Sequence, residues 1–335
     1  MEPNKSRIDK LHLFLTKRCN MECDYCFVKK KHSDMTFQIA KKSIDFLVQQ
    51  KGSRKEIIFF GGEPLLRFDI IKEVLFYVRH IRRSLSIDFY FSLITNGTLL
   101  NKRIINFCIL NKIDIYISLD GTQKNHDSHR ICTSCSYKEI LSKLDYLIRT
   151  NQKFYIMCTT HPEEAENLFK DIHSLFKGGC RNFVINPALG IDWKTEQVKS
   201  YLMTMSDLIN FYNKTNKNKK ILYLNLVDKY NRFQTNHLEI EHPCCEGRLL
   251  AVDTNGDIFY CPYKMEHKIG DVVSGILAKQ YDNYVCKRAY ACSNFFHFTC
   301  KNKGCLQGCT KNFNSYTELF KGIQKPLSIS LRRNI

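Results

Sequence analysis

The chain has 335 residues, of which 44% are apolar, so it can form one large domain or a large domain with a smaller one. Its net charge of +18 is compatible with an anionic partner and equally with a lysine-rich solvated surface. No apolar run approaches the ~18 residues that a membrane span needs, and residues 1–10 are polar and charged. We therefore expect neither a membrane span nor a signal peptide, and we predict a cytoplasmic protein.

In the first 213 residues, short β-rich runs alternate with longer amphipathic runs. Strands are predicted at Leu11–Thr16, Glu56–Phe60, Ile87–Ile94, Ile113–Leu119, Phe154–Cys158 and Asn182–Ile185. Helices are predicted at Phe37–Gln50, Phe68–Arg82, Lys102–Asn111, Tyr137–Thr150, Pro162–Phe176 and Glu196–Asn213. This alternation predicts an α/β fold, a partial (β/α)6 TIM-like barrel in which reactive groups lie on the loops after the strands.

The character of the chain changes after residue 220. A short strand is predicted at Ile221–Val227, and Ala251–Tyr260 is typical of a hairpin with Asn255-Gly256 as its turn. The segment from about 240 to 312 is rich in cysteine and weak in periodicity, so metal ligation rather than a core of its own could order it. We predict a barrel over 1–220, a cysteine-rich iron–sulfur domain over 221–315 and a basic tail over 316–335.

Sixteen cysteines are many for this length, and they are clustered rather than scattered. Three lie between 19 and 26, two at 244 and 245, and six between 261 and 309. In a cytosolic protein such clusters favour metal ligation over disulfides. Cys19, Cys23 and Cys26 follow the first strand, and three thiolates can hold three irons of a cubane while the fourth iron stays open to a small molecule.

Three further motifs follow the next three strands. They are Gly61-Gly62-Glu63-Pro64, Thr95-Asn96-Gly97, and Ser118-Leu119-Asp120-Gly121 followed by His126 and Arg130. In this order and placement, the four motifs resemble those of the radical S-adenosylmethionine (radical SAM) superfamily. The resemblance covers about residues 8–215, and Tyr25 before the third cysteine belongs to it.

The resemblance implies specific roles for these residues. A [4Fe-4S] cluster on Cys19, Cys23 and Cys26 binds S-adenosylmethionine and cleaves it reductively to a 5′-deoxyadenosyl radical. The implied cofactor contacts are the methionine moiety for Gly61, Gly62 and Glu63, the adenine side for Tyr25, the ribose for Ser118 and Asp120, and the carboxylate for Arg130. The residues also have plainer interpretations: a tight turn for the glycines, a helix N-cap for Glu63, an ordinary turn for Asp120, a core position for Tyr25 and a surface charge for Arg130.

The C-terminal cysteines resemble a SPASM-type extension of that superfamily. Cys245, Gly256 and Cys261 match the beginning of its signature and Cys305-x3-Cys309 matches its end, whereas the final cysteine of the signature is missing. The ligands implied for a first auxiliary cluster are Cys244, Cys245, Cys261 and Cys309, and those for a possible second cluster are Cys286, Cys292, Cys300 and Cys305. A tetrahedral zinc site is the alternative.

SPASM enzymes mostly modify peptides or proteins, so the resemblance implies a peptide maturase that makes a thioether or carbon–carbon crosslink in a ribosomally made peptide. Sulfatase maturases share the run Gly61–Leu66, but they carry an aspartate base where this chain has Pro262, which argues against formylglycine formation. That reaction, a radical dehydrogenase or epimerase acting on a small molecule, and a non-catalytic iron–sulfur electron carrier are the alternatives. No catalytic acid or base is assigned.

The expected partners follow from this activity. They are a precursor peptide or protein substrate and an electron donor such as flavodoxin or ferredoxin. Because the first strand begins at Leu11, no leader-binding domain is expected before it, and a separate leader-binding protein fits this arrangement. Neither nucleic acid nor a membrane is expected as a partner.

Overall fold

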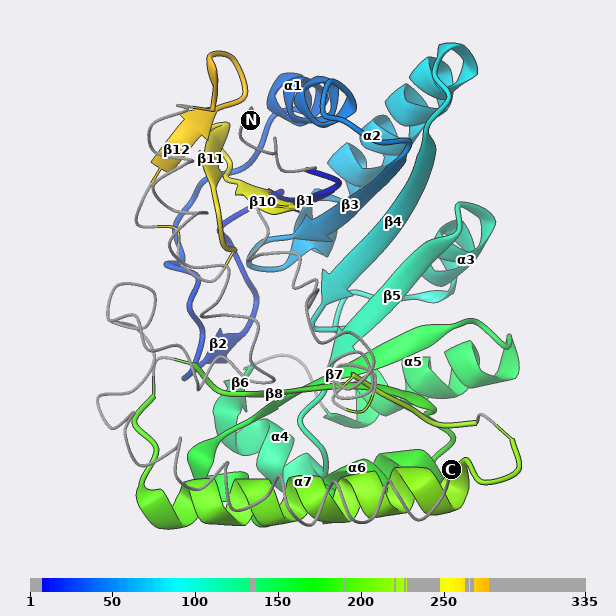
Figure 1. The fold of residues 1–335 in the computed structure, drawn as a ribbon, viewed down its shortest axis with the longest axis vertical. Helices are drawn as coiled ribbons and strands as arrows, with labels where there is room; N and C mark the ends of the chain where they lie inside the picture. Colours follow the sequence, from blue (N-terminus) through cyan, green and yellow to red (C-terminus); the bar gives the residue numbers. More distant parts are fainter. Residues whose placement is uncertain are drawn as a thin grey trace, which may run out of the picture. The chain divides into compact units, whose positions relative to one another are not determined.

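The computed structural model describes residues 8–132, 137–189, 191–219, 221–225, 227, 248–262, 265 and 268–276 (Figure 1). The chain divides into two compact units. The first comprises Met1–Ser118, Ile131–Phe154 and Glu241–Ala289, and the second comprises Leu119–Arg130, Tyr155–Ile240 and Tyr290–Ile335. Among the described residues, no helix combines the length and the apolar character that crossing a bilayer requires.

The first unit is built on a sheet in the order β13-β12-β11-β10-β1-β3-β4-β5. From β10 to β5 neighbouring strands are parallel, whereas β10 to β13 run antiparallel to one another. The strands are β1 (Lys10–Phe14), β3 (Arg54–Phe60), β4 (Asp88–Thr95), β5 (Ile113–Ser118), β10 (Leu249–Val252), β11 (Asp257–Phe259), β12 (Lys268–Asp271) and β13 (Gly275–Ile276). The two-residue strand β2 (Glu22–Cys23) lies in the loop after β1, and β6 (Arg130–Ile131) has its first residue in the second unit.

Helices connect the parallel strands of this unit. They are α1 (Phe37–Val48), η1 (Pro64–Arg67), α2 (Phe68–Ile81), η2 (Arg82–Ser84), α3 (Lys102–Leu110) and α5 (Tyr137–Arg149). Two of them begin at side-chain caps: Thr36 accepts a hydrogen bond from the Ile39 N–H, and Asn101 accepts one from the Ile104 N–H. Such caps satisfy N–H groups that the first helical turn leaves unpaired, so the helices start where the sequence places these residues.

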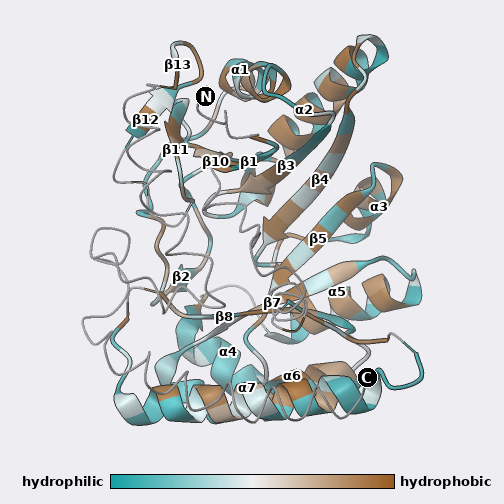
Figure 2. Ribbon diagram, in the orientation of Figure 1, coloured by the Kyte–Doolittle hydropathy of each residue, from teal (hydrophilic) through white to brown (hydrophobic). Residues whose placement is uncertain are grey.

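The core of the first unit lies on its central strands. Leu11 and Leu13 of β1 are fully buried beside Ile57 and Phe59 of β3, their partners in the parallel register. Figure 2 shows that the apolar residues of β3 and β4 gather towards the carboxyl-terminal ends of the strands, where Ile57, Phe59 and Leu93 are fully buried. This buried sheet fixes the positions of the loops that follow its strands.

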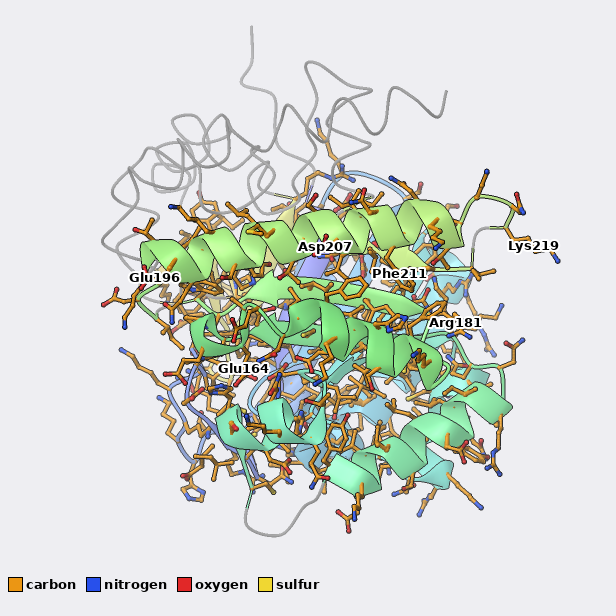
Figure 3. All side chains as sticks on the ribbon, turned by 90° about the horizontal axis from the view of Figure 1, so that it is seen from below. Glu164, Arg181, Glu196, Asp207, Phe211 and Lys219 are labelled. Atoms are coloured by element: carbon orange, nitrogen blue, oxygen red, sulfur yellow. The ribbon has the colours of Figure 1, made fainter. Side chains whose placement is uncertain are left out.

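The second unit carries the parallel strands β7, β8 and β9 with their helices. Its elements are α4 (Gln123–His129), β7 (Phe154–Thr160, whose first residue belongs to the first unit), η3 (Pro162–Glu164), α6 (Leu168–Lys177), β8 (Asn182–Pro187), α7 (Thr195–Thr215) and β9 (Tyr223–Leu224). Phe211 of α7 packs edge-on against Phe169, His173 and Phe176 of α6, which fastens the two helices together (Figure 3).

The strand and helix alternation predicted from the sequence is confirmed, with ends that shift by a few residues. The structure also differs from the prediction: β2, β6, β12 and β13 were not predicted. The predicted Pro162–Phe176 helix divides into η3 and α6, α4 lies where no helix was predicted, and the predicted strand Ile221–Val227 is reduced to Tyr223–Leu224. The predicted hairpin forms, and its first strand also joins the sheet edge beside β1. The domain boundaries at 220 and 315 stay predictions.

Candidate cofactor and metal site

The three-cysteine loop connects β1 to α1. Cys19 and Cys23 are half-buried and Cys26 is exposed, and all three carry reduced thiols. The Met21 N–H donates to Cys19 Sγ at 3.4 Å, and the Cys26 N–H donates to the Cys23 carbonyl at 3.1 Å. Burial raises the pKa of the Cys19 thiol, while the Met21 N–H favours the thiolate. Three thiols on one short loop form a donor set that fits an iron–sulfur cluster.

Gly61 and Gly62 bring the loop after β3 against this cysteine loop. The Gly62 N–H donates to the Thr16 carbonyl at 2.8 Å, and the Glu63 N–H donates to the Arg18 carbonyl at 2.8 Å. A Cβ atom at Gly62 would lie 2.0 Å from the Arg18 carbonyl oxygen, and one at Gly61, whose φ is +145°, would lie 2.4 Å from that of Thr16. Contacts with the protein's own backbone therefore require glycine at both positions. This requirement is independent of the cofactor contacts predicted for the two residues.

Glu63 links the loop after β3 to the loop after β4. Its fully buried carboxylate accepts hydrogen bonds from the Leu65 N–H at 3.0 Å, from Thr95 Oγ1 at 2.7 Å and from the Asn96 N–H at 2.8 Å. Burial raises the pKa of this carboxyl group to about 7, although the hydrogen bonds oppose the shift. The side chain also caps η1, so Glu63 has the structural role of a cap in addition to the cofactor contact predicted for it.

Asn96 extends the same network to the cysteine loop. Its Nδ2 donates to Asn20 Oδ1 at 2.9 Å and reaches Cys19 Sγ at 3.8 Å, while Asn20 Nδ2 donates to Thr98 Oγ1 at 2.8 Å. The Asn96 Oδ1 in turn accepts from the Thr98 N–H and hydroxyl at 3.0 and 2.6 Å. Three of the four motifs found in the sequence thus meet in one hydrogen-bond network.

In the second unit, Asp120 and Arg130 form a buried ion pair. Arg130 Nε donates to Asp120 Oδ2 at 2.7 Å and Nη2 donates to Oδ1 at 2.9 Å, and the Thr159 N–H donates to Oδ1 at 2.9 Å. Both residues are less than 10% exposed, so Arg130 is not a surface charge. The bidentate pairing fixes the plane of the guanidinium group.

His126 holds the backbone of Asp120. Its Nδ1 accepts a hydrogen bond from the Asp120 N–H at 3.4 Å, which requires an imidazole that is unprotonated at this nitrogen. Burial, and to a smaller extent the nearby Arg130 charge, lowers the pKa of His126 to about 4. His126 is therefore neutral at physiological pH and orients the Asp120 loop.

Asp171 is a supporting residue of this loop that the sequence did not reveal. Its Oδ1 accepts from the Thr122 N–H at 3.0 Å and its Oδ2 accepts from Asn125 Nδ2 at 2.6 Å. Gly121 has a φ of +109°, and a Cβ atom there would lie 2.3 Å from the Asp171 Cβ. Burial raises the pKa of the Asp171 carboxyl group. No local motif marks Asp171, because its partners lie almost fifty residues earlier in the chain.

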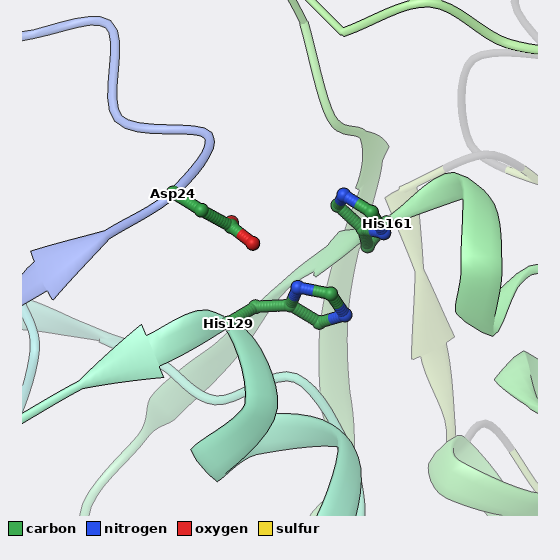
Figure 4. A group of neighbouring side chains, drawn as sticks. All are labelled: Asp24, His129 and His161. Atoms are coloured by element: carbon green, nitrogen blue, oxygen red, sulfur yellow. The ribbon is translucent and has the colours of Figure 1, made fainter.

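His129 and His161 are a second feature that the sequence did not reveal (Figure 4). Their rings stack with centroids 3.9 Å apart and planes 21° apart. His129 is the last residue of α4, and His161, which directly follows β7, accepts a hydrogen bond from the Glu163 N–H at Nδ1. The sequence offered no signal for either residue, because α4 was not predicted and the predicted strand ended at Cys158, before His161.

The remaining predicted site residues are located as follows. Tyr25 is half-buried in the cysteine loop, Ser118 is the half-buried last residue of β5, and Cys261 is a half-buried reduced thiol two residues beyond β11. The other predicted ligands of auxiliary clusters lie outside the described residues: Cys244, Cys245, Cys286, Cys292, Cys300, Cys305 and Cys309. Both auxiliary ligand sets stay predictions.

Residues 13–176 match the family model of the radical SAM superfamily. The chain belongs to this superfamily through that segment, which contains all four motifs and the network between three of them. It is therefore a radical SAM enzyme, which employs a [4Fe-4S] cluster and S-adenosylmethionine.

The sequence is similar to those of characterised and uncharacterised proteins. An uncharacterized protein of Methanocaldococcus jannaschii is 28% identical over 75% of this chain and 84% of its own length. A cysteine-type anaerobic sulfatase-maturating enzyme of Clostridium novyi is 24% identical over 89% of this chain and 86% of its own. The radical SAM cyclopropyl synthase TigE of Paramaledivibacter caminithermalis is 26% identical over 43% of this chain and 34% of its own length.

Solved structures share the fold. Native anSMEcpe with bound AdoMet and the Cp18Cys peptide superimposes with a TM-score of 0.78 and 16% identity, covering 97% of this chain and 99% of that one. Streptococcus suis SuiB bound to its precursor peptide SuiA gives a TM-score of 0.59 and 15% identity, covering 84% and 66%. These similarities confirm the predicted α/β fold class, a partial TIM-like barrel with a C-terminal SPASM-like region.

Proposed function

We propose that Cys19, Cys23 and Cys26 hold a [4Fe-4S] cluster with which this enzyme oxidatively modifies a ribosomally made peptide, forming a thioether or carbon–carbon crosslink. The observation that carries the proposal is the network that ties Cys19 to Glu63 through Asn96. It joins the thiol-bearing loop to the loop of Glu63, which the superfamily resemblance assigns to the cofactor, and to the loop of Asn96, which carries another motif of that resemblance. A structural cysteine cluster has no need of such an arrangement.

The chain's own residues would hold and shield the cofactor. By the superfamily resemblance, Gly61 and Gly62 would contact the methionine moiety, and Arg130, whose guanidinium plane Asp120 fixes, would contact a carboxylate. When bound, the cluster and S-adenosylmethionine supply a radical that abstracts an unactivated hydrogen atom. The predicted contacts of Tyr25 and Ser118 with the adenine and ribose belong to the same proposal.

A peptide substrate is supported by the proteins that this chain resembles. Both anSMEcpe and SuiB have been solved with a bound peptide, and TigE is a cyclopropyl synthase. A net positive charge of +18 suits an acidic leader segment, which a separate protein could also present. Cys261, together with the cysteines predicted from the C-terminal signature, would hold an auxiliary cluster as a sink for the second electron of the oxidation.

Formylglycine formation is the second candidate, since the Clostridium novyi relative matches most of the chain. Against it stands Pro262, which occupies the position that the resemblance assigns to an aspartate base. Proline has no proton-transfer group. We therefore favour crosslinking, and the two reactions differ in their products.

The experiment compares two peptides under identical conditions. Anaerobically reconstituted, dithionite-reduced protein is given S-adenosylmethionine with either a cysteine-containing precursor peptide that has an acidic leader or a cysteine peptide of the sulfatase type. We expect the first peptide to lose two hydrogen atoms while retaining its sulfur, as seen by mass spectrometry. Loss of sulfur from the second peptide, with no change in the first, would replace crosslinking by formylglycine formation.

A further inference from the structure

The turn of the β10–β11 hairpin contacts the first end of the cysteine loop. Lys17 Nζ lies 2.8 Å from Asp253 Oδ2, and the two side chains are only 15% and 6% exposed. Lys17 precedes Cys19 by two residues, whereas Asp253 is more than two hundred residues away in sequence. A charge pair this buried is expensive to break, because either partner alone would be left desolvated.

The same turn contacts the other end of the loop. The hydroxyl groups of Ser33 and Thr254 lie 2.5 Å apart, and Thr254 is 1% exposed. Within the loop, the Lys17 N–H donates to the Ser33 carbonyl at 2.9 Å, which closes its base. One turn of the C-terminal segment therefore forms side-chain contacts with both ends of the loop that carries the three cysteines.

An apolar cluster also connects the cysteine loop to the β10–β11 hairpin. Phe14, Ala251 and Phe259 form a buried group against which Val28, Phe60 and Met265 pack. Val28 lies two residues after Cys26, Phe60 immediately precedes Gly61, and Phe259 lies two residues before Cys261. Phe27 stacks parallel to Phe60, with ring centroids 5.9 Å apart. The cluster thus joins the end of the cysteine loop to the segment that carries Cys261.

The two oxygens of Asp253 have separate tasks. Oδ1 accepts hydrogen bonds from the N–H groups of Asn255 and Asp257, at 2.8 and 3.2 Å, which shapes the turn. Oδ2 receives Lys17. The Oδ1 of an asparagine at this position can still accept the hydrogen bonds from Asn255 and Asp257, while its NH₂ group, a donor, faces the lysine. The substitution therefore breaks the ion pair and keeps the turn.

We infer that the Asp253–Gly256 turn is a positioning element for the three-cysteine loop, and that the Lys17–Asp253 pair holds the loop in the form in which its cluster accepts S-adenosylmethionine. This inference rests on the proposed role of Cys19, Cys23 and Cys26. Because β10 is also a parallel neighbour of β1, the hairpin ties the cysteine loop and Cys261 to one sheet. Lys17 and Asp253 act through the loop and touch no reacting atom.

The test uses full-length, anaerobically reconstituted Asp253→Asn, Lys17→Met and Lys17→Arg variants. The readout is the change in the electron paramagnetic resonance spectrum of the reduced protein on addition of S-adenosylmethionine, which reports only the cluster that binds it. We expect this response to fall by about tenfold in Asp253→Asn and Lys17→Met, because a buried charge loses its partner. Lys17→Arg should retain most of it, since its guanidinium can still pair with the carboxylate.

The matched control is Lys268→Met, which breaks the exposed Lys268–Asp257 pair on the same hairpin. It should respond like wild type, and circular dichroism and iron content establish that each variant is folded and loaded. A wild-type response that persists undiminished in both Asp253→Asn and Lys17→Met would overturn the inference. Absence of any response in wild type itself would instead count against the proposed function.

Discussion

At the residue scale, Gly62 leaves no space for a side chain, because the backbone of Arg18 lies against it. We predict that Gly62→Ala lowers the free energy of unfolding by about 3 kcal/mol, the upper end for overpacking, since a backbone carbonyl cannot rotate away. The displaced loop should also retain less iron after reconstitution. Urea denaturation and iron analysis measure the two effects.

Gly178→Ala is the control for this change. A Cβ atom there would meet only carbonyl oxygens at 3.4 Å or more, so the expected change is within about 0.5 kcal/mol. Equal stability and equal iron content in the two variants would contradict the close contact between Gly62 and the Arg18 backbone.

His12 makes stability depend on pH. It is buried in β1 beside Phe60, and burial, with a smaller contribution from the Lys10 charge, lowers its pKa to about 3. The unfolded chain therefore binds the proton between pH 6.5 and 3 while the folded chain does not. The contribution of His12 is complete above pH 6.5 and is lost as the pH falls towards 3.

We predict that wild type loses about 2–3 kcal/mol relative to His12→Leu between pH 6.5 and 4.5, at 1.36 kcal/mol per pH unit. The comparison with the variant is needed because the raised pKa of Glu63 acts in the opposite direction between pH 4.5 and 7. Replacement of exposed His32 by Gln serves as the control. Parallel stability curves for wild type and His12→Leu would refute the prediction.

Residue chemistry that depends on local sequence could be predicted, and chemistry that depends on distant partners could not. The three cysteines, the Gly-Gly pair and Glu63 stand in short motifs that mark them. Asp171, His129 and Lys17 acquire their roles from residues far along the chain. Arg130 could be named from its motif, but only the fold shows that Asp120 orients it.

At the element scale, α4 and the loop before it depend on α6. Asp171 of α6 accepts the Thr122 N–H and the Asn125 amide at the start of α4, next to the Asp120 loop. We predict that Asp171→Ala lowers the free energy of unfolding by about 1–3 kcal/mol, because the buried Asn125 amide and the half-buried Thr122 N–H lose their acceptor. Asp145→Ala, which breaks an exposed i,i+4 pair with Arg149, should cost no more than about 0.5 kcal/mol.

Urea denaturation of the two variants measures this difference. Equal losses in Asp171→Ala and Asp145→Ala would show that the carboxylate does not support the start of α4.

The hairpin of β10 and β11 shows where prediction of elements from sequence stops. Alternating apolar residues and Asn255-Gly256 were enough to predict a hairpin, because both signals are local. The parallel pairing of β10 with β1 spans more than two hundred residues, and no local pattern specifies it. Likewise, α4 was missed because its seven residues are almost all polar and carry no helical apolar stripe.

At the scale of the whole molecule, the alternation of strands and helices was sufficient to predict the α/β class. Each βα unit shows a short β-rich run followed by a longer run with apolar residues at helical spacing, and both patterns are local. The superfamily could be predicted because its four motifs follow successive strands in a fixed order. The hydrogen-bond network around Glu63 and Asn96 joins three of these motifs within the first unit. This convergence of three motifs is what the central claim rests on.

The most direct test of that claim is reductive cleavage of S-adenosylmethionine. Anaerobically reconstituted, reduced wild-type protein should yield 5′-deoxyadenosine, and the triple variant Cys19→Ala, Cys23→Ala, Cys26→Ala should yield none above the protein-free background. Iron and sulfide analysis must show that wild type is loaded and that the variant has lost one cluster. No 5′-deoxyadenosine from loaded wild type, or an undiminished amount from the triple variant, would contradict the account.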